Sequence, residues 1–190
     1  MWMFEKIDEY LKNTLREKRY IHTKNVVKTA IELAKIHNIS EEKARIGALA
    51  HDSAKNMSNE DLKEIIDKNN IKLTTYEIDA KQIWHAIVAP IVGKELFEIE
   101  DEEILSAMRW HTTGKEDMSK LDKIIYLADM IEPSRDFEGV DEIRKLAKND
   151  LDLAMLSALT HTIKYLIEKN QIIDINTIKA RNYLIKNINS

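Results

Sequence analysis

The amino-acid sequence predicts a single all-α domain, in which helices pack around one core. Apolar residues recur three and four positions apart along nearly the whole chain, which is the helical period, and they do not alternate as in strands. The chain holds only 4 glycines and 2 prolines, whereas an all-β fold needs a turn after roughly every ten residues. With 190 residues it is also long enough to bury one sizeable core.

Apolar stripes mark the expected helices in chain order. They are Phe4-Ile7-Leu11-Leu15, Val26-Val27-Ala30-Leu33-Ala34, Ile104-Leu105-Ala107-Met108, Leu121-Ile124-Ile125-Ala128, Leu156-Leu159-Ile163-Leu166 and Ile178-Tyr183-Leu184-Ile188. Each stripe would place one apolar helix face against the core.

Capping residues indicate where several helices begin. The candidate N-caps are Ser40, Ser58, Thr74, Asp101 and Ser119. Ser58 and Thr74 are each followed three positions later by a carboxylate, which is the capping-box pattern. Breaks are expected near Asn38, Asn69-Asn70, Gly114, Pro133-Ser134 and Asn149-Asp150. Pro90 lies within an apolar run, where we expect a helix to start, turn or kink.

Composition excludes several classes of protein. Without cysteine there is no disulfide, thiolate zinc site or catalytic thiol, so any metal must be held by imidazole and carboxylate. A formal charge of −4, from 29 basic and 33 acidic residues, argues against a general nucleic-acid binder. No apolar run approaches the roughly 18 residues of a membrane span, and charged residues follow the first four positions too soon for a secretory signal. We expect a soluble, cytoplasmic protein.

Four residues stand out among the histidines and carboxylates. His22 shares the helical period of the apolar stripe that follows it, and therefore faces inward. His51 is followed directly by Asp52, and Asp129 interrupts an apolar run. A carboxylate buried without a partner is costly, and a metal ion is one such partner.

The other histidines divide into two groups. His85 and His111 end apolar helical stretches, where a scaffold can direct a side chain into a shared cavity. His37 lies at a polar helix end, and His161 has no acidic residue nearby, so we interpret both as ordinary residues. A lone histidine on a helix is more often a surface or hydrogen-bonded core residue than a ligand.

The order of these residues is more specific than any one pair. His22, His51-Asp52, His85, His111 and Asp129 resemble the H…HD…H…H…D series of the HD-domain metal-dependent phosphohydrolases. The local motifs are similar to those of the YqeK-type branch, the symmetrical bis(5'-nucleosyl)-tetraphosphatases, which split diadenosine tetraphosphate into two ADP. These motifs are ALAHDSAK (48–55), WHA (84–86), RWHTTGK (109–115) and KIIYLADMIEPSRDF (123–137).

The resemblance implies two metal ions, divalent or trivalent. Iron is expected first, with manganese or another transition metal as alternatives, and imidazole with carboxylate suits these ions. By the family pattern, the first ion is held by His22, His51, Asp52 and Asp129 and the second by His85 and His111, with Asp52 bridging. A bridging hydroxide, activated by the metals, would be the nucleophile.

The resemblance also implies which residues bind the phosphates. Lys55 lies three positions after Asp52, and Arg135 can offer a bidentate fork to phosphate oxygens. These two cations, together with Asp52, are the expected catalytic residues. Further phosphate contacts are expected from the segment after the fourth family histidine, namely Thr112, Thr113, Gly114 and Lys115. The alternative for each basic residue is an ordinary solvated charge.

For the whole chain, the resemblance implies one HD domain over residues 1–190, with a core at about 19–135 and C-terminal helices at 140–188 that pack on it. The expected partner is a small nucleotide, with a homodimer as a further expectation and neither nucleic acid nor membrane. Family members usually place a proline nearer the histidine than Pro90 stands to His85, which affects the local backbone rather than the ligand.

Alternative functions remain open. One is an HD phosphohydrolase that acts on another nucleotide, such as a nucleoside phosphatase, and another is a non-catalytic nucleotide-sensing domain. The complete ligand series argues against the sensing domain. The sequence lacks the motifs of two other HD branches. The Gly-Tyr-Pro element of the cyclic-dinucleotide phosphodiesterases is absent. Residues 53–56, SAKN, stand where the guanosine-tetraphosphate hydrolases have an acidic pair.

Overall fold

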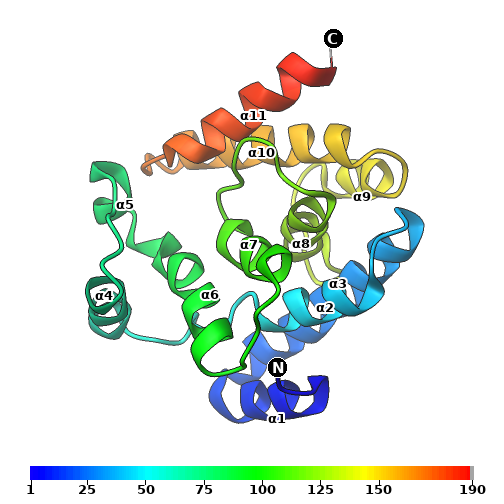
Figure 1. Ribbon diagram of the computed structural model, residues 1–190. Helices are drawn as coiled ribbons and strands as arrows, with labels where there is room; N and C mark the ends of the chain where they lie inside the picture. The colour runs from blue at the N-terminus through cyan, green and yellow to red at the C-terminus, as the bar shows by residue number, and fades with distance from the viewer. Residues whose placement is uncertain (189–190) are drawn as a thin grey trace.

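The computed structural model describes residues 1–188, which form eleven α-helices, one 3-10 helix and no strand (Figure 1). The helices are α1 (Phe4–Thr14), α2 (Glu17–Ile36), α3 (Glu41–Ala50), α4 (Asn59–Lys68), α5 (Thr75–Asp79), η1 (Lys81–Ile83), α6 (Trp84–Glu95), α7 (Glu102–Trp110), α8 (Lys120–Ile131), α9 (Val140–Asn149), α10 (Leu151–Glu168) and α11 (Ile175–Ile188). The predicted all-α class is confirmed.

Helix α8 forms the centre of the core. Ile124, Ile125 and Leu127 are fully buried, because α2, α3, α7, α9 and α10 all pack against this one helix. Figure 1 shows α8 near the middle of the molecule, with α10 and α11 crossing above it and α1 below α2. A helix that is apolar on nearly every side is stable only in such a surrounded position.

The five predicted N-caps are all confirmed. Ser40 accepts a hydrogen bond from the Lys43 amide at the start of α3, and the Asp101 carboxylate accepts from two amides at the start of α7. Full capping boxes open α4, α5 and α8 at Ser58, Thr74 and Ser119. These helix starts could be read from the sequence because a cap involves only residues within three positions of one another.

Two positions differ from, or sharpen, the expectations. Helix α6 neither starts nor ends at Pro90 but continues through it to Glu95. The Pro90 ring is half-buried and lines a surface pocket, so it does not have to fit inside the core. Gly114, in the segment between α7 and α8, has a φ of +67°, and a Cβ there would lie 3.3 Å from the Cβ of Ala180 in α11. No helix among residues 1–188 has the length and apolar character required to cross a membrane.

Candidate metal centre

Six predicted ligands come together where five helices meet. His22 lies on α2, His51 and Asp52 directly follow α3, His85 is the second residue of α6, His111 follows α7, and Asp129 lies in the last turn of α8. All are buried except Asp129, which is half-buried. Most of them therefore stand at helix ends, where a side chain can leave the helix surface and enter the shared space.

Asp52 lies at the middle of the group. Its Oδ1 is 3.3 Å from Nε2 of His85 and 3.5 Å from Nε2 of His111. Its Oδ2 is 3.6 Å from Nε2 of His51 and accepts a 2.9 Å hydrogen bond from Arg19. The two oxygens thus face different histidines.

The histidine rings are oriented by bonds on their other nitrogen. Nδ1 of His51 lies 2.6 Å from the Ala48 carbonyl, and Nδ1 of His111 lies 2.7 Å from the Met108 carbonyl. Since a carbonyl only accepts, each Nδ1 must carry the proton, and each Nε2 presents a lone pair to the centre.

The residues present fit a metal ion. Nε2 of His22 and Nε2 of His51 are buried and have no hydrogen-bond partner within the described part of the chain, although the His22 atom lies 3.0 Å from Oδ1 of Asp129. Two sets of donor atoms each lie within 4.8 Å of one another, namely His22-His51-Asp129 and His51-Asp52-His111. Buried nitrogen and oxygen donors without partners are the groups that a transition metal would satisfy.

The charge states suit the same purpose. Burial lowers the pKa of His51 to about 4 and the pKa of His85 to about 3, so both rings are neutral near pH 7. Burial alone would raise the pKa of Asp52, but His51 and His111 hold it well below its usual range. A neutral imidazole and an ionised carboxylate are the forms that bind metals.

Glu132 is a site residue that the sequence analysis did not single out. It is fully buried, and its Oε1 accepts a 3.0 Å hydrogen bond from Nδ1 of His22. Its Oε2 accepts bonds from Asn25 and from the Ser134 amide, and the Ser134 hydroxyl donates to Oε1. A carboxylate that orients a ligating histidine in this way raises the basicity of the ring. The signal available was its place three residues after Asp129.

Three cations border the centre. Lys55 Nζ lies 3.1 Å from Nε2 of His85, and Arg135 donates to Oδ1 of Asp129 at 2.7 Å. Arg19, which the sequence analysis did not name as a site residue, is the third and binds Asp52. Its position three residues before His22 on α2 placed it on the same helix face. All three line a pocket of about 570 Å³ that opens beside the centre.

The segment after His111 divides between the site and the core. Thr112 lines a pocket beside the centre, and its hydroxyl oxygen has no hydrogen-bond partner among residues 1–188. Thr113 is buried and donates to the Gly114 carbonyl, and Gly114 packs toward α10 and α11. Lys115 Nζ lies 3.5 Å from the carboxylate of Asp122. The structure therefore does not bring the last three beside the ligands, and their role in phosphate binding stays a prediction.

The remaining histidines stand apart from the centre. Nε2 of His37 lies 2.6 Å from the Ala147 carbonyl, and His161 packs on the ring of Phe137.

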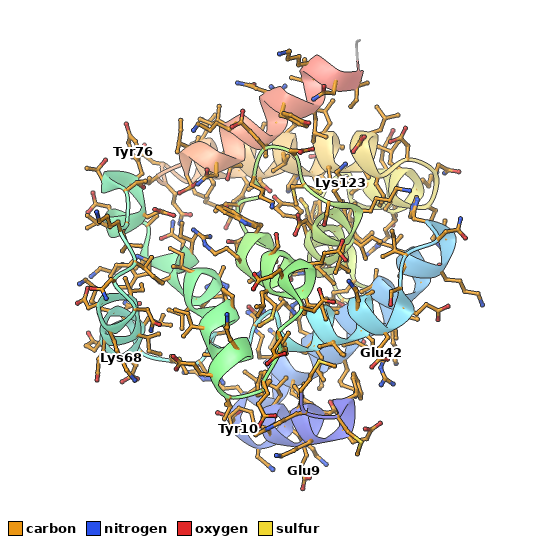
Figure 2. All side chains as sticks on the ribbon, in the orientation of Figure 1. Glu9, Tyr10, Glu42, Lys68, Tyr76 and Lys123 are labelled. Carbon is orange, nitrogen blue, oxygen red and sulfur yellow. The ribbon has the colours of Figure 1, made fainter. Side chains whose placement is uncertain are left out.

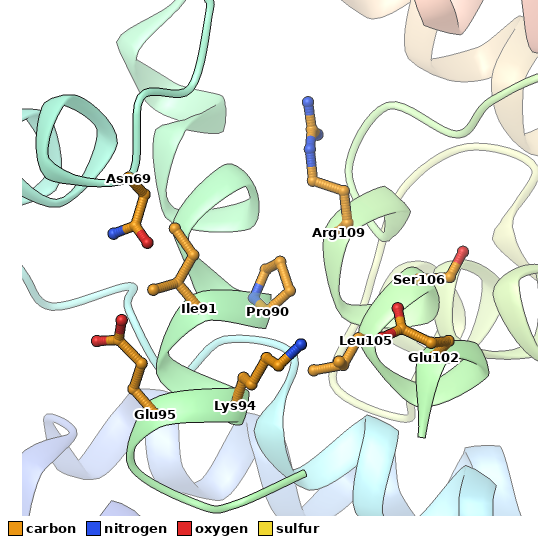
Figure 3. A pocket seen from close by; sticks show the side chains of 9 residues that line it. All are labelled: Asn69, Pro90, Ile91, Lys94, Glu95, Glu102, Leu105, Ser106 and Arg109. Carbon is orange, nitrogen blue, oxygen red and sulfur yellow. The ribbon is translucent and has the colours of Figure 1, made fainter. Parts of the chain in front are cut away.

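A separate pocket of about 370 Å³ lies between α6 and α7, with Pro90 on one side and Arg109 on the other (Figure 3). None of the six predicted ligands lines that pocket.

Comparisons with known proteins agree with this geometry. The HD domain model matches residues 19–134. The chain is 42% identical over 176 residues to the symmetrical bis(5'-nucleosyl)-tetraphosphatase of Bacillus subtilis, covering 92% of this chain and 94% of the relative. It is 34% identical to the Staphylococcus aureus protein of the same name, with 94% and 93% covered. A solved structure from Clostridium acetobutylicum, described as a predicted HD superfamily hydrolase involved in NAD metabolism, superposes with a TM-score of 0.95 at 46% identity, covering 98% of this chain and 99% of that one.

Proposed function

This chain belongs to the HD domain family, and from that premise we propose that it is a hydrolase that cleaves dinucleoside tetraphosphates symmetrically. Diadenosine tetraphosphate and water would give two ADP. The observation that carries this proposal is the group of four histidines and two aspartates at the junction of five helices, all buried except the half-buried Asp129 and bordered by Arg19, Lys55 and Arg135. Similarity to relatives with this activity along more than nine-tenths of the chain supports it.

The proposed metal content is two ions, with iron first and manganese as an alternative. His22, His51, Asp52 and Asp129 would hold one, and His85 and His111 the other, with Asp52 shared. The separate directions of the two Asp52 oxygens support this sharing. When bound, the ions would supply Lewis acidity, which would lower the pKa of a bound water toward 7 and offset the negative charge of the phosphates.

The chain's own residues would bind and orient the phosphates. The guanidinium groups of Arg19 and Arg135 can each donate two bonds to phosphate oxygens, whereas the Lys55 ammonium acts as a compact charge. Burial lowers the pKa of Lys55, in spite of the attraction of Asp52. In symmetrical cleavage, water adds across the central phosphoanhydride bond, so these cations must hold two phosphates on either side of it.

Product identification tests the proposal. Protein loaded with iron or manganese should convert diadenosine tetraphosphate to ADP alone, as measured by chromatography of the reaction. Equal amounts of AMP and ATP would contradict symmetrical cleavage. Absence of turnover with every divalent metal would favour the nucleotide-sensing alternative, and faster turnover of a mononucleotide would favour the other HD phosphohydrolases.

A matched pair of variants tests the site. Asp52→Ala should abolish metal binding and activity together, because this carboxylate contacts both groups of histidines. Asp67→Ala is the control, since Asp67 is an exposed carboxylate of α4 that pairs with Lys63 on the same helix. Full activity of Asp52→Ala would contradict the assignment. Cytoplasmic location and a homodimer are further proposals, and sedimentation tests the dimer.

A further inference from the structure

Two pockets of different character flank the candidate metal centre. The first, which we call the cationic pocket, has a volume of about 570 Å³ and is lined by Arg16, Lys18, Arg19, Lys55 and Arg135 among others. The second, which we call the aromatic pocket, has a volume of about 260 Å³ and is lined by Tyr126, Met130, Phe137 and Thr162, with His111 and Asp129 at its inner side. Arg135 lines both pockets, so the pockets adjoin at this residue.

The two linings suit different parts of a nucleotide. Among the described residues that line the cationic pocket, only His22 carries a ring. Five cations line the pocket against one carboxylate, that of Glu132, so its net positive charge suits a phosphate chain. The aromatic pocket holds Asp129 and Arg135 at its boundary with the centre, and its remaining side chains carry no fixed charge. Its volume lies just below the roughly 300–1,000 Å³ of pockets that enclose a whole ligand. It therefore suits one fragment of a dinucleotide.

Phe137 is held in place as a wall of the aromatic pocket. It lies in the segment between α8 and α9, and its ring centroid is 4.3 Å from that of His161 on α10, with the planes 36° apart. His161 does not line the aromatic pocket but lines a separate groove beside α9. One side of the Phe137 ring is thus backed by His161. A ring supported in this way can stack on a base without first losing its own freedom.

We infer that the aromatic pocket binds one nucleoside of the substrate, with its base stacked on Phe137, and that the cationic pocket receives the phosphates of the other half. The inference rests on the proposed function, because it assigns the two halves of that substrate. It follows that the two bases are held unequally. The second nucleoside has no ring to stack on in the cationic pocket and contributes little to binding.

Binding of two diphosphates to metal-loaded protein, measured by calorimetry, tests the assignment. ADP and pyrophosphate share the diphosphate group but differ in the nucleoside. In Phe137→Ala we expect the affinity for ADP to fall about tenfold, which corresponds to about 1.4 kcal/mol, and the affinity for pyrophosphate to stay unchanged. Phe137→Trp should retain the affinity for ADP. Phe137→Leu keeps an apolar contact with His161 but has no aromatic face, so it should repeat the loss even if the alanine variant folds poorly.

The control variant is Tyr76→Ala. Tyr76 projects from α5 at the outside of the molecule (Figure 2) and is 54% exposed, so its loss should change neither affinity. An equal loss of ADP and pyrophosphate binding in the Phe137 variants would overturn the inference, as would no loss of either. If the protein cleaves no dinucleoside tetraphosphate, the proposed function fails, while the two diphosphates still decide whether Phe137 recognises a nucleoside.

A substrate with one nucleoside tests the role of the cationic pocket. Adenosine 5'-tetraphosphate and water should give ADP and pyrophosphate, with a KM of the same order as that of diadenosine tetraphosphate. This result is expected because the phosphates alone would fill the cationic pocket. A much higher KM for the mononucleotide would show that the second base is recognised, and would overturn the unequal binding.

Discussion

Substitution of Glu132 by glutamine should weaken metal binding without removing any predicted ligand. In this variant one carboxylate oxygen becomes an NH2 group. In the wild-type protein, Oε1 of Glu132 faces donors on His22 and Ser134, and Oε2 faces donors on Asn25 and Ser134. Whichever position the NH2 group takes, it meets hydrogen-bond donors. If it faces His22, the ring is driven to carry its proton on Nε2, which is the nitrogen needed for the metal.

The size of the effect follows from these contacts. Loss of a carboxylate that orients a ligating histidine costs about 10- to 100-fold in metal affinity, which corresponds to about 1.4 to 2.8 kcal/mol. The metal-free protein should also lose about 2–4 kcal/mol of stability, because hydrogen bonds to a charged group are worth roughly 1 kcal/mol more than neutral ones. Glu132 accepts several such bonds while fully buried.

Titration with a competing chelator measures the metal affinity, and urea unfolding of the metal-free protein measures the stability. Glu138→Gln is the matched control, since Glu138 is an exposed carboxylate six positions further along the chain. A Glu132→Gln protein that binds metal as tightly as the wild type would refute the reasoning, because the His22 ring would then be oriented without this carboxylate.

Four further predictions concern single features. Arg19→Ala should raise KM about tenfold, since a bond to a charged group is lost, and elemental analysis should find its metal content unchanged; an unchanged KM would remove Arg19 from the phosphate site. Gly114→Ala should lose about 1–2 kcal/mol in urea unfolding, because alanine is strained at positive φ, and equal stability would contradict that strain. His37→Ala should keep full turnover, so any loss of metal from this variant would show that the ligand set is wrong. The pKa values of about 4 for His51 and about 3 for His85 lie below their usual 6.5, so the unfolded chain takes up more protons below pH 6.5. The melting temperature of the metal-free protein should stay constant above pH 6.5 and fall as the pH drops from 6.5 toward about 4. A melting temperature that rises on acidification would contradict the neutral state of the two rings.

The sequence predicted well those features that depend on neighbours along the chain. The capping boxes at Ser58, Thr74 and Ser119 involve residues three positions apart, and the apolar period showed where helices pack. The family order of histidines and aspartates also led to residues that the structure brings together. The order alone does not state how each ring is turned, because that depends on carbonyls and carboxylates at the folded site.

Glu132 and Phe137 show which features of the site could not be predicted from the sequence. Glu132 bonds to His22, 110 positions away, and no local pattern reports such a contact. Phe137 could be recognised as an aromatic residue, but its support by His161 depends on the packing of α10 against α8 in the folded chain. Lys115 shows that closeness in sequence does not fix closeness in space. It follows the fourth family histidine by four positions, yet its Nζ lies 3.5 Å from Asp122, and its role in phosphate binding stays a prediction.

The turn at the end of α3 and of α7 has a consequence for the construction of metal sites in other proteins. His51 and His111 each follow their helix directly, and each bonds through Nδ1 to the carbonyl three residues earlier. That carbonyl belongs to the last turn, where helix oxygens otherwise lack an intrahelical partner, and the helix end carries partial negative charge. One continuous piece of chain therefore supplies the ligand, its tautomer and a favourable field. A designer could end a helix with histidine and obtain an imidazole already set for a cation, without recruiting a carboxylate from elsewhere in the scaffold.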